Sequence, residues 1–175
     1  NIMVELPNLS DAKTGKWQLP ANLEPNAVMP YYYGKKVAAG ETVPADGLPL
    51  FVYMHGSGPK AQEWITGLKL AQMFEDSPSA YFIPQIPNEG NYYRWWQKSK
   101  QWAWEKLLRM AMLSGEINPN RIYMFGISEG GYGSQRLASY YADYLAAAGP
   151  MAGGEPLRNA PVENCANIGF SFLTG

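Results

Sequence analysis

The sequence predicts an α/β fold in which a mostly parallel β-sheet carries helices on both faces. Beyond residue 48, short apolar runs typical of buried strands alternate with segments whose apolar residues recur at helical spacing. Two runs of glycine and serine, HGSG at 55–58 and GISEGG at 126–131, directly follow such apolar runs. Ligands of open parallel sheets bind at the carboxyl ends of the strands, so these two runs are the first candidates for a functional site.

Length and composition predict one domain. The chain has 175 residues, near the usual size of a single domain, and 46% of them are hydrophobic, which is enough for a substantial core. We therefore treat residues 1–175 as one domain. Its first part, residues 1–48, is rich in Pro, Asn and Gly and is expected to form short strands and turns.

The charge balance restricts the class of partner. Fourteen Lys and Arg against fifteen Asp and Glu leave a net charge of -1. The chain thus has no excess of basic residues that would indicate binding to nucleic acid or to an anionic membrane. No apolar run reaches the roughly 18 to 20 residues that span a bilayer, and the amino end lacks the pattern of a signal peptide. A small molecule or a polysaccharide is the expected partner.

The sequence predicts neither a metal nor a cofactor. It holds one His and one Cys, too few for a zinc site built from the usual nitrogen and sulfur ligands. The lone Cys165 excludes an intrachain disulfide and is expected to be a small buried residue before a strand.

The first half of the chain contains two predicted strands and one predicted helix after the turn-rich region. Within that region AVMPYYYG (27–34) is a candidate for short antiparallel strands. The run from Leu50 to Met54 predicts a strand buried on both faces, and AQEWITGLKLAQMFED (61–76) has helical spacing. AYFIPQIP (80–87) predicts another short strand, ended by its prolines.

The second half continues the alternation. KSKQWAWEKLLRMAMLSGE (98–116) predicts a helix through Trp104, Leu107, Leu108, Ala111 and Met112, ended by Gly115 and Pro119. The remaining segments are a strand, a helix, a short strand and a last strand: RIYMFGI (121–127), GGYGSQRLASYYADY (130–144), LAAAGPMAGG (145–154) and IGFSFLTG (168–175).

Ser128 is the predicted nucleophile. Gly126, Ser128 and Gly130 form a Gly-x-Ser-x-Gly motif between a predicted strand and a predicted helix. In this motif the serine occupies a tight, strained turn that only small neighbours tolerate, so that its hydroxyl projects over the edge of the sheet. The helix that follows offers unpaired N–H groups and a positive dipole where an oxyanion would develop.

The HGSG run is the predicted second part of an oxyanion hole. Small residues after a strand allow the backbone to approach a substrate carbonyl. We assign the two donors to the N–H groups of Glu129 and Ser57, with Gly58 as the next candidate. His55 is the only imidazole, but one loop does not easily supply both a donor and a general base, so we interpret His55 as a residue that orders the loop.

These motifs together resemble the α/β-hydrolase superfamily. Within it, PLFVYMHGSG, YFIPQIP, INPNRIYMFGISEGGYGSQRLA and LAAAGPMAGG are similar to secreted esterases related to polyhydroxybutyrate depolymerases, feruloyl esterases and acetylxylan esterases. The resemblance covers about residues 28–175. It implies a serine nucleophile at Ser128, a helix behind it, an ester or amide substrate, and a place outside the cytoplasm, extracellular or periplasmic.

The sequence departs from this family in the rest of the catalytic triad. The family order is Ser, then Asp or Glu, then His, yet no histidine follows Ser128. Asp143 is expected to be a solvated or capping carboxylate. Glu155 follows a predicted strand and is a candidate acid in an alternate position, although without a base it has nothing to orient.

Three explanations account for the missing groups. The chain is a fragment of an incomplete α/β-hydrolase domain, or a pseudoenzyme that binds without cleaving, or it works with a second polypeptide that supplies the acid and the histidine. A last strand IGFSFLTG without further cover would expose an apolar edge, which favours the fragment.

The loop NEGNYYRWWQKSKQWAW (88–104) is the candidate substrate-binding segment. We predict that Tyr93, Trp95 and Trp96 form a stacking platform for sugar or feruloyl groups. The alternative is that the rings of this segment belong to the core or close the loop against the domain. In that alternative Trp102 and Trp104 are helix residues, at least one of them in the core, and the others close the loop. The others are Tyr92, Tyr93, Trp95 and Trp96.

The sequence thus predicts a serine hydrolase that cleaves carboxylic esters through an acyl-enzyme, on carbohydrate-linked or short-chain substrates. Two alternatives stay open. One is a peptidase of the prolyl-oligopeptidase type, and the other is a carbohydrate-binding pseudoenzyme.

Overall fold

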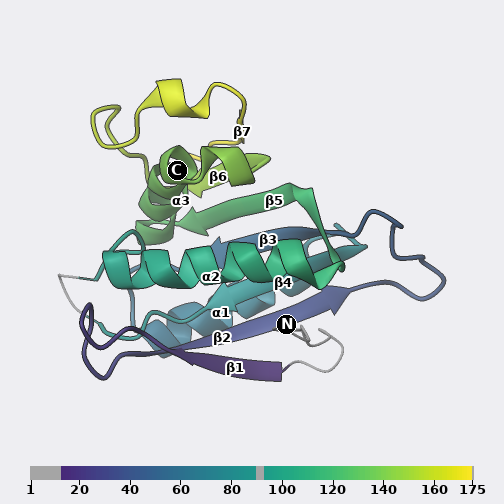
Figure 1. Ribbon diagram of the computed structural model, residues 1–175, viewed down its shortest axis with the longest axis horizontal. Coiled ribbons are helices and arrows are strands. Elements are labelled where there is room, and N and C mark those ends of the chain that lie inside the picture. Colours follow the sequence, from purple (N-terminus) through teal and green to yellow (C-terminus); the bar gives the residue numbers. More distant parts are fainter. Residues whose placement is uncertain (1–12, 90–92, 175) are drawn as a thin grey trace.

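The computed structural model describes residues 13–89 and 93–174, so Tyr92 lies outside the described residues. They form one seven-stranded sheet with the strand order β1-β2-β4-β3-β5-β6-β7 (Figure 1). The strands are β1 Lys13–Gln18, β2 Val28–Lys36, β3 Leu48–Met54, β4 Ser79–Pro84, β5 Ile117–Ile127, β6 Ala147–Met151 and β7 Gly169–Phe170. The helices are α1 Lys60–Met73, α2 Lys98–Ser114, α3 Glu129–Tyr140 and the short 3₁₀ helices η2 Ala142–Tyr144 and η3 Val162–Cys165.

The sheet is mostly parallel, as predicted. β1 pairs with β2 and β2 with β4 in antiparallel fashion, whereas β4, β3, β5, β6 and β7 run parallel to one another. The predicted antiparallel strands of the turn-rich region are therefore the edge of the main sheet. The carboxyl ends of β3 and β5 lie side by side, because Met54 pairs with Gly126.

Helices cover both faces of the sheet, α2 and α3 on one and α1 on the other (Figure 1). Side chains of a strand point alternately to the two faces. Leu50, Val52 and Met54 of β3 accordingly pack in the cluster that holds α2 and α3, whereas Phe51 and Tyr53 pack in the cluster that holds Ala71 of α1. Burial on both faces explains why β3 is an uninterrupted apolar run in the sequence.

The described elements match most predicted boundaries. α2 ends at Ser114 and is followed by Gly115, which adopts the left-handed conformation at φ 68°, as expected for a glycine after the last turn. Its predicted buried face is confirmed, but Met112 is 44% exposed, because it lies at the edge of the apolar stripe, one residue past Ala111. The predicted helix 130–144 ends at Tyr140 and is followed by η2.

Several strands differ from their predicted lengths. β4 is Ser79–Pro84 and β6 is Ala147–Met151, both shorter than the predicted 80–87 and 145–154. β5 begins at Ile117 rather than at residue 121, because a shift of register lets Ile117 pair with Leu48 ahead of Pro119. β7 is shorter than the predicted strand 168–175. The chain nevertheless follows β6 to Leu173, since the N–H groups of Gly169, Ser171 and Leu173 all donate to carbonyls next to or within β6.

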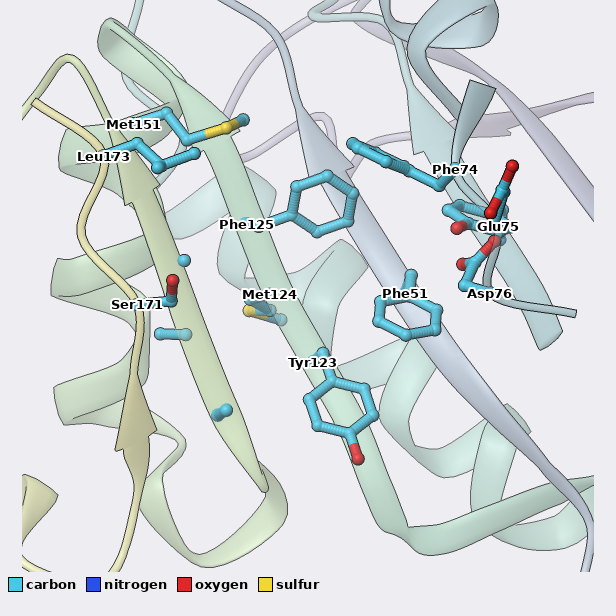
Figure 2. A pocket seen from close by; sticks show the side chains of 14 residues that line it. Phe51, Phe74, Glu75, Asp76, Tyr123, Met124, Phe125, Met151, Ser171 and Leu173 are labelled. Carbon is cyan, nitrogen blue, oxygen red and sulfur yellow. The ribbon is translucent and has the colours of Figure 1, made fainter. Parts of the chain in front are cut away.

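The α1 face of the sheet is only partly covered. Beside α1, an apolar groove of about 470 Å³ lies over β3, β5 and β6. Phe51 and Phe125 rise from the sheet into this groove, and Phe74, which follows α1, faces Phe125 across it (Figure 2). None of the predicted site residues lines the groove, so it is separate from the candidate site.

A buried ion pair fastens the β1–β2 connection to α2. The side chain of Lys100 is only 2% exposed, and its Nζ lies 2.5 Å from Oε2 of Glu24. The Glu24 carboxylate also accepts hydrogen bonds from Ser99 Oγ at 2.6 Å and Asn88 Nδ2 at 2.5 Å. A buried ammonium is tolerated only while a carboxylate accompanies it.

Replacing Glu24 should therefore destabilise the protein. We expect Glu24→Ala to lower the free energy of unfolding by about 3 to 5 kcal/mol, because the Lys100 ammonium stays buried without a carboxylate and keeps only the Gln97 side-chain oxygen, at 2.8 Å. The control is Glu105→Ala, which removes the exposed pair with Arg109 and should change stability by less than about 0.5 kcal/mol. Urea unfolding of the two variants measures both values, and equal effects would contradict the prediction.

Candidate active site

Ser128 occupies the turn between β5 and α3 in a strained conformation. Its φ of 53° and ψ of -114° lie in a region that residues other than glycine rarely adopt. The backbone is held there because its N–H donates to the carbonyl of Met151 at 2.9 Å and its carbonyl accepts from the N–H of Tyr132 at 3.0 Å. The side chain is exposed at the carboxyl end of β5, as the motif predicts.

Glycines make this turn possible by allowing backbone segments to approach closely. A Cβ on Gly130 would lie 1.9 Å from the carbonyl oxygen of Met54, and a Cβ on Gly126 would lie 2.4 Å from the same atom. A Cβ on Gly153 would lie 2.4 Å from the carbonyl oxygen of Ser128. The turn is thus wedged between the end of β3 and the residues after β6.

The loop 55–58 lies directly beside Ser128. A Cβ built on Gly56 would be 3.5 Å from the Cβ of Ser128. Both polar groups of Gly56 are engaged: its N–H donates to Oε2 of Glu63 at 3.2 Å, and its carbonyl accepts from the Tyr93 hydroxyl at 3.2 Å. Within this loop the remaining candidate donors for an oxyanion are therefore the N–H groups of Ser57 and Gly58. Glu129 begins α3 on the other side of Ser128.

His55 is a structural residue. It is completely buried, its Nε2 accepts from the N–H of Ile86 at 3.1 Å, and its Nδ1 lies 2.7 Å from the carbonyl of Gly56, to which it donates. Burial lowers its pKa to about 4, although the Gly56 carbonyl and Glu89 act in the opposite direction. With both nitrogens engaged, the imidazole orders the loop and has no nitrogen free to take a proton from Ser128.

The structure corrects the role predicted for Trp95 and Tyr93. Trp95 is 0% exposed and Tyr93 is 6% exposed, so neither ring offers a free face for a sugar. Trp95 donates from Nε1 to the carbonyl of His55 at 2.9 Å and packs against Gly133. Both rings therefore pack against the loop 55–58 and hold it in place. This agrees with the alternative that these rings close their own loop against the domain.

Trp96 is half-buried and differs from its neighbours. The guanidinium of Arg136 lies over its ring, 4.7 Å from the centroid. The predicted contact of Trp96 with substrate stays a prediction. Trp104 is a core residue, fully buried between Trp95 and Phe82, as the alternative interpretation expected.

Two ion pairs flank the start of α3. Nε of Arg94 lies 3.4 Å from Oε1 of Glu129, and Arg136 lies 3.6 Å from Oε1 of Glu155. Burial raises the pKa of the Glu129 carboxyl, Arg94 acts to lower it, and the charge of Glu155 raises it further. The Glu155 side chain is 6% exposed and also accepts from Asn159 at 2.8 Å, so its carboxylate is already engaged. Asp143 is exposed in η2, as expected for a solvated carboxylate.

Glu63 is the site residue that sequence reasoning missed. It lies in the first turn of α1, and its carboxylate reaches back to the loop 55–58. A usable signal existed, because an acidic residue in the first turn of a helix directly after a glycine-rich loop can accept N–H groups of that loop.

Among the residues that the structure describes, no group of His, Cys, Asp and Glu could hold a metal ion. Within the same part of the chain, no helix is long and apolar enough to cross a bilayer.

Comparison with known proteins identifies the fold. No family model and no curated protein sequence matches the chain. Solved structures do match: a thermostable esterase has 22% sequence identity and a TM-score of 0.67 over 93% of this chain. The fluorophosphonate-binding serine hydrolase FphF of Staphylococcus aureus has 13% identity and a TM-score of 0.57 over 85% of this chain. The chain has the α/β-hydrolase fold.

An acetyl xylan esterase from Aspergillus awamori shares this fold, with 14% identity and a TM-score of 0.55 over 78% of this chain. The chain spans only part of each relative, 46% of the thermostable esterase, 60% of FphF and 50% of the acetyl xylan esterase. The similarity therefore concerns about half of the length of these relatives.

The close approach at Gly130 gives a prediction on stability. We expect Gly130→Ala to lower the free energy of unfolding by about 3 kcal/mol or more, because the new methyl group meets the rigid carbonyl of Met54. Gly154→Ala is the matched control, since its Cβ would meet only a side-chain oxygen of Gln135 at 3.7 Å. Urea unfolding compares the two, and similar midpoints would show that the turn can move away from β3.

The buried imidazole gives a prediction on pH dependence. The pKa of His55 is about 4 in the folded chain against an ordinary value of 6.5, so the unfolded chain takes up a proton first as the pH falls. The neutral His55 therefore contributes fully to the free energy of unfolding above pH 6.5. This contribution, about 3 kcal/mol, is lost as the pH falls from 6.5 to 4. Urea unfolding from pH 7.5 to 4 should show this loss in the wild type and not in His55→Gln. Parallel profiles would contradict it.

Proposed function

We propose that this chain carries the nucleophile and the oxyanion-binding groups of a serine hydrolase that cleaves carboxylic esters. The observation that carries the proposal is the strained backbone of Ser128, which presents an exposed hydroxyl next to the loop 55–58. Strain of this kind persists only where the surrounding structure enforces it, and it is concentrated at functional sites. A solvated serine in an ordinary turn would adopt an unstrained backbone conformation.

The mechanism proposed is acyl transfer. The Oγ of Ser128 attacks the ester carbonyl carbon while a general base takes the hydroxyl proton, and the carbonyl oxygen becomes an oxyanion. The N–H groups of Glu129 and of Ser57 or Gly58 hold that oxyanion. Its collapse breaks the bond to the alkoxy oxygen, which leaves with the proton as an alcohol. Water then attacks the acyl-enzyme, releases the carboxylic acid and restores the serine.

The general base is proposed to come from outside these 175 residues. The chain has a single histidine, His55, and its two ring nitrogens are bound to the backbone of Ile86 and Gly56. Glu155 is likewise held by Arg136 and Asn159 and is not proposed as the triad acid. Residues beyond this sequence, on the same or on another polypeptide, would then supply the acid and the base.

The substrate class proposed is a short-chain or carbohydrate-linked ester. The structural relatives named above include an acetyl xylan esterase, which is consistent with such a substrate. Trp96 retains partial exposure, so any contact with a sugar is proposed for this residue and not for the buried Trp95 or Tyr93.

Removal of the Ser128 hydroxyl tests the proposal. In the protein as its gene encodes it, Ser128→Ala should lower kcat/KM for an aryl acetate by at least about 10³-fold and abolish labelling by a fluorophosphonate. Thr66→Ala, on the exposed side of α1, serves as the control and should leave both unchanged.

Two outcomes would contradict the proposal. Retained turnover in Ser128→Ala would remove this serine from the mechanism. A wild-type protein that binds xylan-derived oligosaccharides but neither turns over an aryl acetate nor reacts with a fluorophosphonate would establish the binding-only alternative. A panel of aryl esters and peptide amides distinguishes the esterase from the peptidase.

A further inference from the structure

We propose that Glu63 is a positioning residue that holds the loop 55–58 in the shape needed for oxyanion binding. The inference rests on the proposed function, since it assigns a role to Glu63 in the same site. Glu63 does not touch Ser128 in any contact described above, and its action would pass through the loop.

The carboxylate of Glu63 accepts a hydrogen bond from Gly56 and lies beside Gly58. Its Oε2 accepts the N–H of Gly56 at 3.2 Å. Its Oε1 lies so close to Gly58 that a Cβ there would be 2.3 Å away, and the Glu63 Cγ and Cδ would each be 3.0 Å from that Cβ. Gly58 thus packs beside the Glu63 side chain, and Ser57 lies between it and the hydrogen-bonded Gly56.

The position of Glu63 is itself fixed. Its N–H donates to the carbonyl of Pro59 at 2.9 Å in the first turn of α1, so the residue is part of a regular helix. The loop leaves β3, turns at Gly56 to Gly58 and enters α1. Glu63 is the fourth residue of that helix. Its hydrogen bond with Gly56 connects the helix back to the start of the loop and so closes the loop into a small ring. A side chain on a helix is a more rigid support than another loop.

The opposite side of the loop is held independently. The carbonyl of His55 accepts from Trp95, and the carbonyl of Gly56 accepts from Tyr93 and His55. These contacts hold the carbonyls of His55 and Gly56, whereas Glu63 holds the N–H of Gly56. An oxyanion is bound by N–H groups, so Glu63 acts next to the amides on which the proposed chemistry depends.

The hydrogen bond between Gly56 and Glu63 also determines which amides of the loop can bind the oxyanion. The N–H of Gly56 points to a carboxylate and is not available for a substrate oxygen. Donors in an oxyanion hole must be aimed in advance, and a displacement of 1 Å can reduce the rate by about 10²-fold. Loss of the Glu63 carboxylate would free the Gly56 amide and allow the Ser57 and Gly58 amides to move.

Three variants test this role in the protein as its gene encodes it. Glu63→Ala should lower kcat for an aryl acetate by about 10-fold or more with KM changed less than about threefold, because the contact matters most when the oxyanion forms. Glu63→Gln keeps an oxygen that accepts the Gly56 N–H and should recover kcat to within about threefold of wild type. Gln62→Ala, an exposed neighbour on α1, is the matched control and should behave as wild type.

Amide hydrogen exchange supplies a readout that does not depend on turnover. The Gly56 amide should exchange at least about 10-fold faster in Glu63→Ala than in the wild type or in Glu63→Gln, whereas the amides of β5 should be unchanged. Slow exchange of Gly56 in Glu63→Ala would overturn the proposal whatever the activity. Equal losses of kcat in Glu63→Ala and Glu63→Gln would show that the negative charge of Glu63 matters and its hydrogen bond to Gly56 does not. This result would also overturn the proposal.

The result separates the two proposals made here. An active wild type with an equally active Glu63→Ala would overturn the role of Glu63 and leave the serine hydrolase intact. An inactive wild type that is not labelled at Ser128 would overturn the proposed function and with it the catalytic purpose of the Glu63 contact.

Discussion

The contact between the end of β3 and the turn after β5 is the constraint on which the site depends. The carbonyl of Met54 lies where a Cβ of Gly126 or Gly130 would have to be. These two glycines therefore allow the first turn of α3 to rest on β3, and that position forces Ser128 into its strained conformation. The hydrogen bond from Ser128 to Met151 holds the turn from the side of β6. Three neighbouring parallel strands thus determine where one hydroxyl points.

Burial of polar groups shapes the loop beside this turn. His55 and Gly56, the first residues of the loop, are buried, so their backbone groups need partners within the protein. His55, Tyr93, Trp95 and Glu63 supply them. The aromatic residues that follow β4 thereby contribute to the site from beneath, as a scaffold for the loop. Trp96, which keeps partial exposure, is covered on one face by Arg136.

Sequence reasoning succeeded where a local pattern has one physical explanation. The apolar runs of β3 and β5, the helical spacing of α2 and the glycine at its end each follow from burial or from backbone geometry. It failed for Trp95, because an aromatic residue in a polar loop is equally compatible with a stacking platform and with a core position. The length of β7 was also overestimated, since Phe172 and Leu173 are apolar but exposed.

The sequence by itself determined the alternation of strands and helices and the order of the motifs, including the Gly-x-Ser-x-Gly motif around Ser128, because spacing and residue type are local properties. Only the tertiary structure decided that His55 is neutral and buried, that Trp95 and Tyr93 support a loop, and that Glu63 reaches back to Gly56. These properties depend on contacts between residues that are far apart in the chain or on the direction of a side chain. Neither follows from the order of residues alone.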